Sequence, residues 1–159
     1  MAKVIDRGDI SLHQADALLF GDPEDLGNEA MDALDARYGK DAEGQSLLRM
    51  WAAYLASQPG WGPGIIAPNK LGPKEDQLVI FCCVRKAGEP PEYMHVRDSM
   101  LKVVEKAKDL GVKHVVTGVL GRGHGNVKVA ALDPVISSAV GKTLMVDIYD
   151  EFEKGKVPV

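Results

Sequence analysis

The sequence has 159 residues, of which 45% are hydrophobic and 26% charged, as in soluble globular proteins, and this composition excludes disordered, collagen-like and coiled-coil chains. The formal net charge of −4 argues against binding of nucleic acid phosphates over a broad surface, although it does not exclude a local basic pocket. No apolar run could span a bilayer and the N-terminus lacks the apolar stretch of a secretion signal, so we expect a cytoplasmic protein without membrane contacts. The length fits a single domain, residues 1–159, with 150–159 as a tail.

Two short strands are expected near the start of the chain, at Lys3–Ile5 and Ala17–Phe20. The second is apolar at successive positions, as in a central strand covered on both faces. From Pro23 onward, apolar residues recur at helical spacing until Gly39, which is a natural stop. Ser46–Ala56 repeats the helical pattern, and the prolines and glycines of SQPGWGPG then predict a loop.

The second half of the chain predicts more strands and helices in alternation. Buried strands are expected at Gly64–Ala67, Leu78–Val84 and His114–Leu120, and a last strand is expected at Thr143–Tyr149. The clearest amphipathic stripe runs from Tyr93 to Leu110 and ends at Gly111, which predicts a helix. Residues 127–141 are also expected to be helical, with a restart or kink at Asp133-Pro134, because proline removes a backbone donor.

This alternation indicates an α/β fold, in which a mostly parallel sheet is covered by helices on both faces. Ligands in such sheets usually bind beyond the carboxyl ends of the strands.

The cysteines and histidines give no sign of a metal site. Cys82 and Cys83 are adjacent in an apolar run, so their side chains should point to opposite faces of a strand, and we interpret both as reduced core or near-core residues. His13, His95 and His114 are too scattered for a ligand set. We therefore predict no metal.

The segment GVLGRGHGN, residues 118–126, carries four glycines in nine residues and follows a predicted strand. A glycine-rich turn between a strand and a helix can present several backbone N–H groups to an anion, because no side chain holds the anion away. The glycine spacing fits neither the dinucleotide fingerprint nor the Walker loop, so a plain tight turn remains an alternative.

Two stretches of the chain resemble macrodomains, the modules that bind ADP-ribose. VIDRGDISLHQADALLF is similar to their opening, with Gly8-Asp9-Ile10 after a first strand and Asp16-Ala17 at the entry of the second. LGRGHGN then follows a long helix and a strand, where macrodomains carry their phosphate-binding loop. The likeness covers roughly Lys3 to Tyr149 and implies a three-layer α/β/α fold.

The resemblance also implies a ligand and its contacts, with no further cofactor. Asp9 and Ile10 would recognise adenine, since a carboxylate offers only acceptors and the exocyclic amine of adenine is a donor. Asp9 could instead cap a turn. The residues that would wrap the diphosphate are Leu120, Gly121, Arg122, Gly123, His124, Gly125 and Asn126. The side chains of Arg122 and His124 could also simply face water.

The chain departs from macrodomains that hydrolyse ADP-ribose linkages. Those proteins carry Asn-Ala-Ala-Asn and a glycine run after the second strand, where this chain has GDPEDLGNEAMDAL. Asp22, Glu24 and Asp25 bring three carboxylates to the expected ribose end of the site and are the candidate catalytic residues. The favoured interpretation is that these acids and Pro23 begin a helix.

Three functions therefore remain open. Binding of ADP-ribose or a related adenosine diphosphate nucleotide is favoured over hydrolysis of ADP-ribosyl linkages by the acidic cluster. The third is a protein-interaction module with a degenerate pocket, in which a protein partner or a second copy covers one sheet face. Trp61, in the loop GWGPG, could stack on a base or fold back onto its own loop.

Overall fold

The computed structural model describes residues 2–5, 16–22, 28–70, 78–85, 89–90, 92–117, 120, 129–141 and 144–149. The strands are β1 (Ala2–Ile5), β2 (Ala17–Phe20), β3 (Ile66–Asn69), β4 (Leu78–Cys82), β5 (His114–Thr117) and β6 (Met145–Tyr149). The helices are α1 (Asn28–Tyr38), α2 (Leu47–Ala56), α3 (Tyr93–Leu110) and α4 (Val129–Val140). The predicted ranges of the first two strands and of the first three helices are confirmed to within a few residues.

All six strands form one sheet in the order β1-β6-β5-β2-β4-β3. Every neighbouring pair is parallel except β3 and β4, which are antiparallel. The prediction of a mixed, mostly parallel α/β sheet is therefore confirmed.

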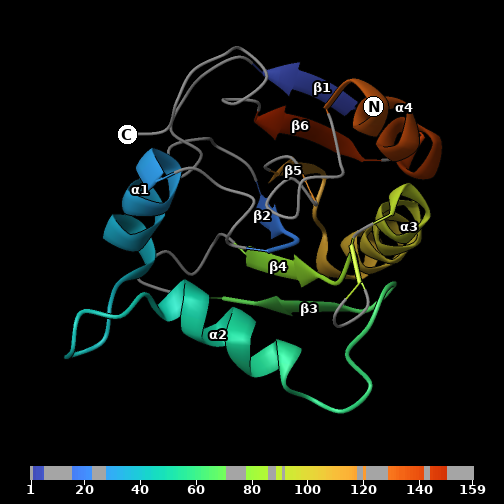
Figure 1. Ribbon diagram of the computed structural model, residues 1–159. Coiled ribbons are helices and arrows are strands. Elements are labelled where there is room, and N and C mark those ends of the chain that lie inside the picture. The colour runs from blue at the N-terminus through green and yellow to red at the C-terminus, as the bar shows by residue number, and fades with distance from the viewer. Residues whose placement is uncertain are drawn as a thin grey trace.

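Helices cover both faces of this sheet, as Figure 1 shows. Leu18 and Phe20 of β2 face a core cluster that includes buried residues of α1 and α2, whereas Ala17 and Leu19 face a cluster with α3 and α4. Successive side chains of a strand point to opposite faces, so a strand buried on both must be apolar throughout. The run Ala17–Phe20 meets this requirement, and all four of its residues are buried.

Local signals fix the ends of the helices. The Ser46 hydroxyl accepts a hydrogen bond from the Arg49 amide at 3.2 Å and caps the start of α2. Gly111 has φ +71°, a left-handed conformation that ends α3 and that other residues adopt only with strain. Gly39 likewise has a positive φ, of 100°, directly after α1.

Two predicted elements differ from the structure. The strand expected at Gly64–Ala67 is β3, which lies two residues later and forms a sheet edge whose residues are partly exposed, so the prediction of a buried strand there is wrong. The segment around Asp133-Pro134 does not restart, because α4 is one helix that runs through Pro134. Its packing against α3 and β1 outweighs the backbone hydrogen bond that proline removes.

Other predictions concern the loops and the cysteines. Cys82 and Cys83 form no disulfide and both are buried, as predicted. Trp61 is half-buried and packs against the core cluster on the α1 and α2 face. No described helix is both long and apolar enough to cross a bilayer.

Candidate functional site

The parallel strands β1, β6, β5, β2 and β4 end along one side of the sheet, which we call the carboxyl edge. The chain leaves β2 towards α1 and α2 on one face, and it leaves β5 towards α4 on the other face. The next strands along these two routes, β3 and β6, lie on opposite sides of the β2–β5 pair in the sheet. Such a switch point between neighbouring strands opens a crevice, and open α/β sheets bind ligands there. The topology thus singles out the carboxyl ends of β2 and β5.

Two residues from the predicted site are described, and both follow these strands. Leu19 of β2 lies opposite Thr117 of β5, so the strands end side by side. Asp22 comes two residues after β2 and is half-buried, and Leu120 comes three residues after β5. Asp22 and Leu120 therefore follow two strands that lie side by side, although the two residues are almost 100 positions apart in sequence.

The Leu120 side chain is only 1% exposed and belongs to the core cluster that α3 and α4 cover. A ligand contact at Leu120 would therefore come from its main chain. The other residues predicted to bind the nucleotide lie outside the described residues: Asp9, Ile10, Gly121, Arg122, Gly123, His124, Gly125 and Asn126.

The acidic cluster is described only at Asp22. Asp22 lies two residues after β2 and six positions before Asn28, the first described residue of α1, and the predicted helix start at Pro23 lies outside the described residues. Glu24 and Asp25 lie outside the described residues. Within the described ranges, no three His, Cys, Asp or Glu side chains are grouped closely enough to hold a metal ion.

A buried serine anchors the carboxyl end of β4. Ser99, on α3, is fully buried and donates a hydrogen bond to the Cys83 carbonyl at 2.6 Å. Its hydroxyl also accepts a hydrogen bond from the Gly64 amide at 3.3 Å, and the Cys83 amide donates to the Ile65 carbonyl at 2.9 Å. These contacts tie the loop that follows Trp61 to α3 and to the end of β4.

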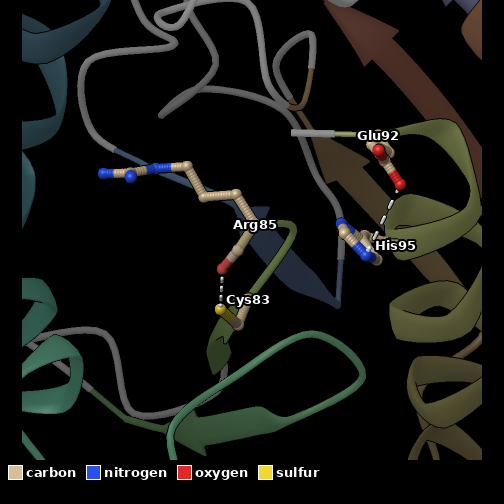
Figure 2. A network of polar contacts seen from close by, with 4 residues as sticks. All are labelled: Cys83, Arg85, Glu92 and His95. Atoms are coloured by element: carbon tan, nitrogen blue, oxygen red, sulfur yellow. Dashed lines mark hydrogen bonds and ion pairs between the residues drawn. The ribbon is translucent and has the colours of Figure 1, made fainter. Parts of the chain in front are cut away.

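The Cys83 thiol lies at this anchor and donates a hydrogen bond to the Arg85 carbonyl at 3.0 Å (Figure 2). Burial raises the pKa of the thiol above its ordinary value, and Arg85 only partly offsets this effect. The thiol is therefore protonated at neutral pH, and a protonated thiol is a poor nucleophile and a poor metal ligand.

One turn before Ser99, the His95 side chain is buried and lies close to Glu92, with Nε2 at 3.8 Å from the Glu92 carboxylate (Figure 2). Its second ring nitrogen, Nδ1, is buried and has no hydrogen-bond partner among the residues that the structure describes. In Figure 2 the Arg85 side chain extends away from His95. From the sequence His95 was considered only as a metal ligand, although its place on the apolar side of the predicted helix was a signal for a buried polar side chain.

A shallow depression of about 350 Å³ lies elsewhere, beside the edge strand β3. It is lined by Gly64, Ile65, Ile66, Lys102, Glu105, Lys106 and Asp109. Its charges are of mixed sign and it does not lie at the switch point between β2 and β5. It therefore has neither the position nor the charge expected of the predicted nucleotide site.

Comparisons with known proteins agree with this architecture. No protein-family model matches the sequence, and no curated protein matches it. Among solved structures, the macrodomain of Thermus aquaticus DarG is similar over 94% of this chain and 98% of its own, with a TM-score of 0.65 and 18% identity. The macrodomain of Mycobacterium tuberculosis DarG is similar over 94% and 97%, with a TM-score of 0.66 and 16% identity.

A third solved structure is that of Thermosipho africanus DarTG in complex with ADP-ribose. The similarity covers 92% of this chain and 40% of that one, with a TM-score of 0.60 and 17% identity. Together with the sheet order and the helices on both faces, these matches show that the chain has the macrodomain fold.

Proposed function

We propose that the protein binds ADP-ribose or a related adenosine diphosphate nucleotide at the carboxyl edge of its sheet. The observation that carries the proposal is the macrodomain fold, with its switch point between β2 and β5. The solved complex of a structurally similar protein with ADP-ribose supports this class of ligand.

In this proposal the amides of residues 121–125 contact the diphosphate. The chain reaches this glycine segment from β5 and continues from it into α4. The amino end of a helix carries a partial positive charge and free amide groups, both of which favour a phosphate. Gly121, Gly123 and Gly125 leave the main chain open to a close approach because they have no Cβ atom.

Asp9 and Ile10 recognise adenine in the same proposal. They follow β1, which is the outermost strand on the side of the sheet beyond β5 and β6. A nucleotide whose diphosphate lies beyond β5 can therefore extend its adenine towards β1 and its far end towards β2 and β4. The Asp9 carboxylate accepts a hydrogen bond from the adenine amine, and the Ile10 main chain assists.

Calorimetric titration with ADP-ribose, ADP and NAD tests the proposal. We expect heat of binding with at least ADP-ribose, and no heat with any of the three at high concentration would reject it. Asp9→Ala should weaken binding by about 1–3 kcal/mol, since it removes a charged acceptor from the adenine amine. Asp32→Ala is the matched control, because Asp32 is an exposed aspartate on α1, and this change should leave the affinity unaltered.

A second variant tests the phosphate contact. Gly123→Val should weaken all three diphosphate ligands in parallel, because a branched side chain crowds the main chain that approaches the phosphates. Unchanged affinity for this variant would contradict the assignment of the glycine segment.

A further inference from the structure

The outermost strand β3 and the helix α3 border an open groove away from the proposed nucleotide site. This edge groove is the depression of about 350 Å³ lined by Gly64, Ile65, Ile66, Lys102, Glu105, Lys106 and Asp109. Ile65 is 43% exposed, and the side chains of Lys102 and Glu105 are 59% and 72% exposed. The groove is therefore accessible to another molecule.

A proline makes this edge of the sheet unsuitable for a further strand. The Ile65 carbonyl accepts a hydrogen bond from the Cys83 amide and so points towards the chain that extends β4. Because main-chain groups alternate in direction along a strand, those of Ile66 and Pro68 point away from β4. Proline has no N–H to donate, and prolines on edge strands oppose pairing with another strand. The edge groove therefore favours a helix of a partner over a strand.

The helix side of the edge groove carries charges of alternating sign. Along α3 the order is positive, negative, positive, negative, at Lys102, Glu105, Lys106 and Asp109. When this order is read from the other end, every sign is reversed. A helix that carries the same charges and lies antiparallel to α3 therefore places an opposite charge against each of them.

A second copy of the chain provides such a helix. Closed pairs of identical chains are related by a two-fold axis, and an axis perpendicular to α3 sets the two α3 helices antiparallel. With the axis between Glu105 and Lys106, Lys102 faces Asp109 of the second copy. Glu105 then faces Lys106 of the second copy. All four charges of each copy are paired with charges of opposite sign.

Neighbouring registers place like charges together. A slide by one helical turn towards the start of α3 sets Asp98 against Asp109 of the second copy. Asp98 lies on the groove side of α3, since a Cβ atom at Gly64 would be 3.9 Å from the Asp98 Cβ atom. A slide the other way sets Lys102 against Lys113 of the second copy, and both lysines are exposed. Like charges that face each other across an interface repel, so the order of charges selects one register.

We propose that the edge groove is the contact surface of a homodimer, in which the α3 helices of two copies lie antiparallel about a two-fold axis between Glu105 and Lys106. Ile65 supplies an apolar contact beside the charge pairs. Exposed charge pairs contribute little free energy each, so the dimer dissociates on dilution. The groove lies beside β3 and not at the switch point, so this inference does not depend on nucleotide binding.

Reversal of the charges on α3 tests the proposed dimer. An acidic variant carries Lys102→Glu and Lys106→Glu, and a basic variant carries Glu105→Lys and Asp109→Lys. Within each variant the four charges of the groove have one sign, so each should dimerise at least about tenfold more weakly than the unsubstituted chain. An equimolar mixture of the two variants should form a heterodimer, because each charge again meets its opposite.

Sedimentation equilibrium between about 10 µM and about 1 mM protein measures these associations. The matched control combines Lys40→Glu with Arg49→Glu, which reverses two exposed positive charges outside α3. This control should dimerise as the unsubstituted chain does, and an equal loss there would assign the effect to net charge and overturn the proposal.

Three other results would also overturn it. One is an unsubstituted chain that stays monomeric at the highest concentration. Another is an acidic or basic variant that dimerises by itself as strongly as the unsubstituted chain, which would place the interface elsewhere. The third is a mixture of the two variants that stays monomeric, which would contradict the antiparallel register.

Discussion

Ser99 shows how a single side chain can hold the carboxyl edge in place. Its hydroxyl bridges the Cys83 carbonyl and the Gly64 amide, two main-chain groups that neither β3 nor β4 contains. An unpaired buried carbonyl or amide costs free energy, so removal of the bridge leaves two groups unsatisfied at once.

Ser99→Ala should therefore lower the free energy of unfolding by about 1–3 kcal/mol. Ser138→Ala is the matched control, because the Ser138 hydroxyl is exposed and contacts only the Val135 carbonyl of its own helix. That change should stay within about 0.5 kcal/mol. Urea denaturation of both variants measures the difference, and equal stabilities would contradict a bridging role for Ser99.

Cys83 gives the protein a dependence on alkaline pH. Because burial raises the pKa of the folded thiol, the unfolded chain loses this proton first as the pH rises. The contribution of the buried, protonated thiol to the free energy of unfolding is complete below the ordinary thiol pKa. It is lost as the pH rises from that value through the raised pKa of the folded protein. Between about pH 8 and 10, the free energy of unfolding should fall more steeply for the unsubstituted protein than for Cys83→Ala. Parallel curves from urea denaturation would show that burial of the thiol contributes nothing.

At the residue scale, the sequence singled out Asp16 as part of the resemblance to macrodomains but did not predict what its side chain contacts. Asp16-Ala17 carried part of the resemblance to macrodomains, and the structure shows what the aspartate does. Its carboxylate accepts hydrogen bonds from the Lys113 and His114 amides at 2.8 and 3.1 Å, which holds the start of β5 beside β2. The burial of His95 was not predicted, because it depends on contacts between segments that are distant in sequence.

At the element scale, the helices were predictable because their signals are local. These signals are the apolar stripe from Tyr93 to Leu110, the glycine that ends it and the Ser46 cap. Each depends on residues that are close together in the sequence. The edge position of β3 was not predictable from its own residues. A short apolar run is compatible with a central or an edge strand, and only the pairing with β4 decides between them.

Two neighbouring leucines on α2 test how this helix packs. Leu48 is fully buried in the cluster under α1 and α2, whereas Leu47 is 37% exposed. Leu48→Ala should destabilise the protein by about 2–5 kcal/mol through lost burial and a cavity, and Leu47→Ala by less than about 1 kcal/mol. Urea denaturation compares the two, and a larger loss at Leu47 would mean that α2 presents the opposite face to the sheet.

At the scale of the whole molecule, the alternation of strands and helices predicted a mostly parallel sheet but not its strand order. The order depends on contacts such as β2 with β4 and with β5, which join segments about 60 and 100 residues apart. The same order creates the switch point, so the position of the proposed site could be inferred from the sequence only in outline. Two short motifs indicated the macrodomain fold, and the similarity to solved structures shows that fold.

A crystal of the protein soaked with ADP-ribose tests most directly whether the carboxyl edge is a nucleotide site. We predict density along that edge, with adenine beyond β1 and the diphosphate at the glycine segment after β5. A nucleotide bound instead in the depression beside the outermost strand β3 and α3, or no bound nucleotide at high concentration, would contradict it.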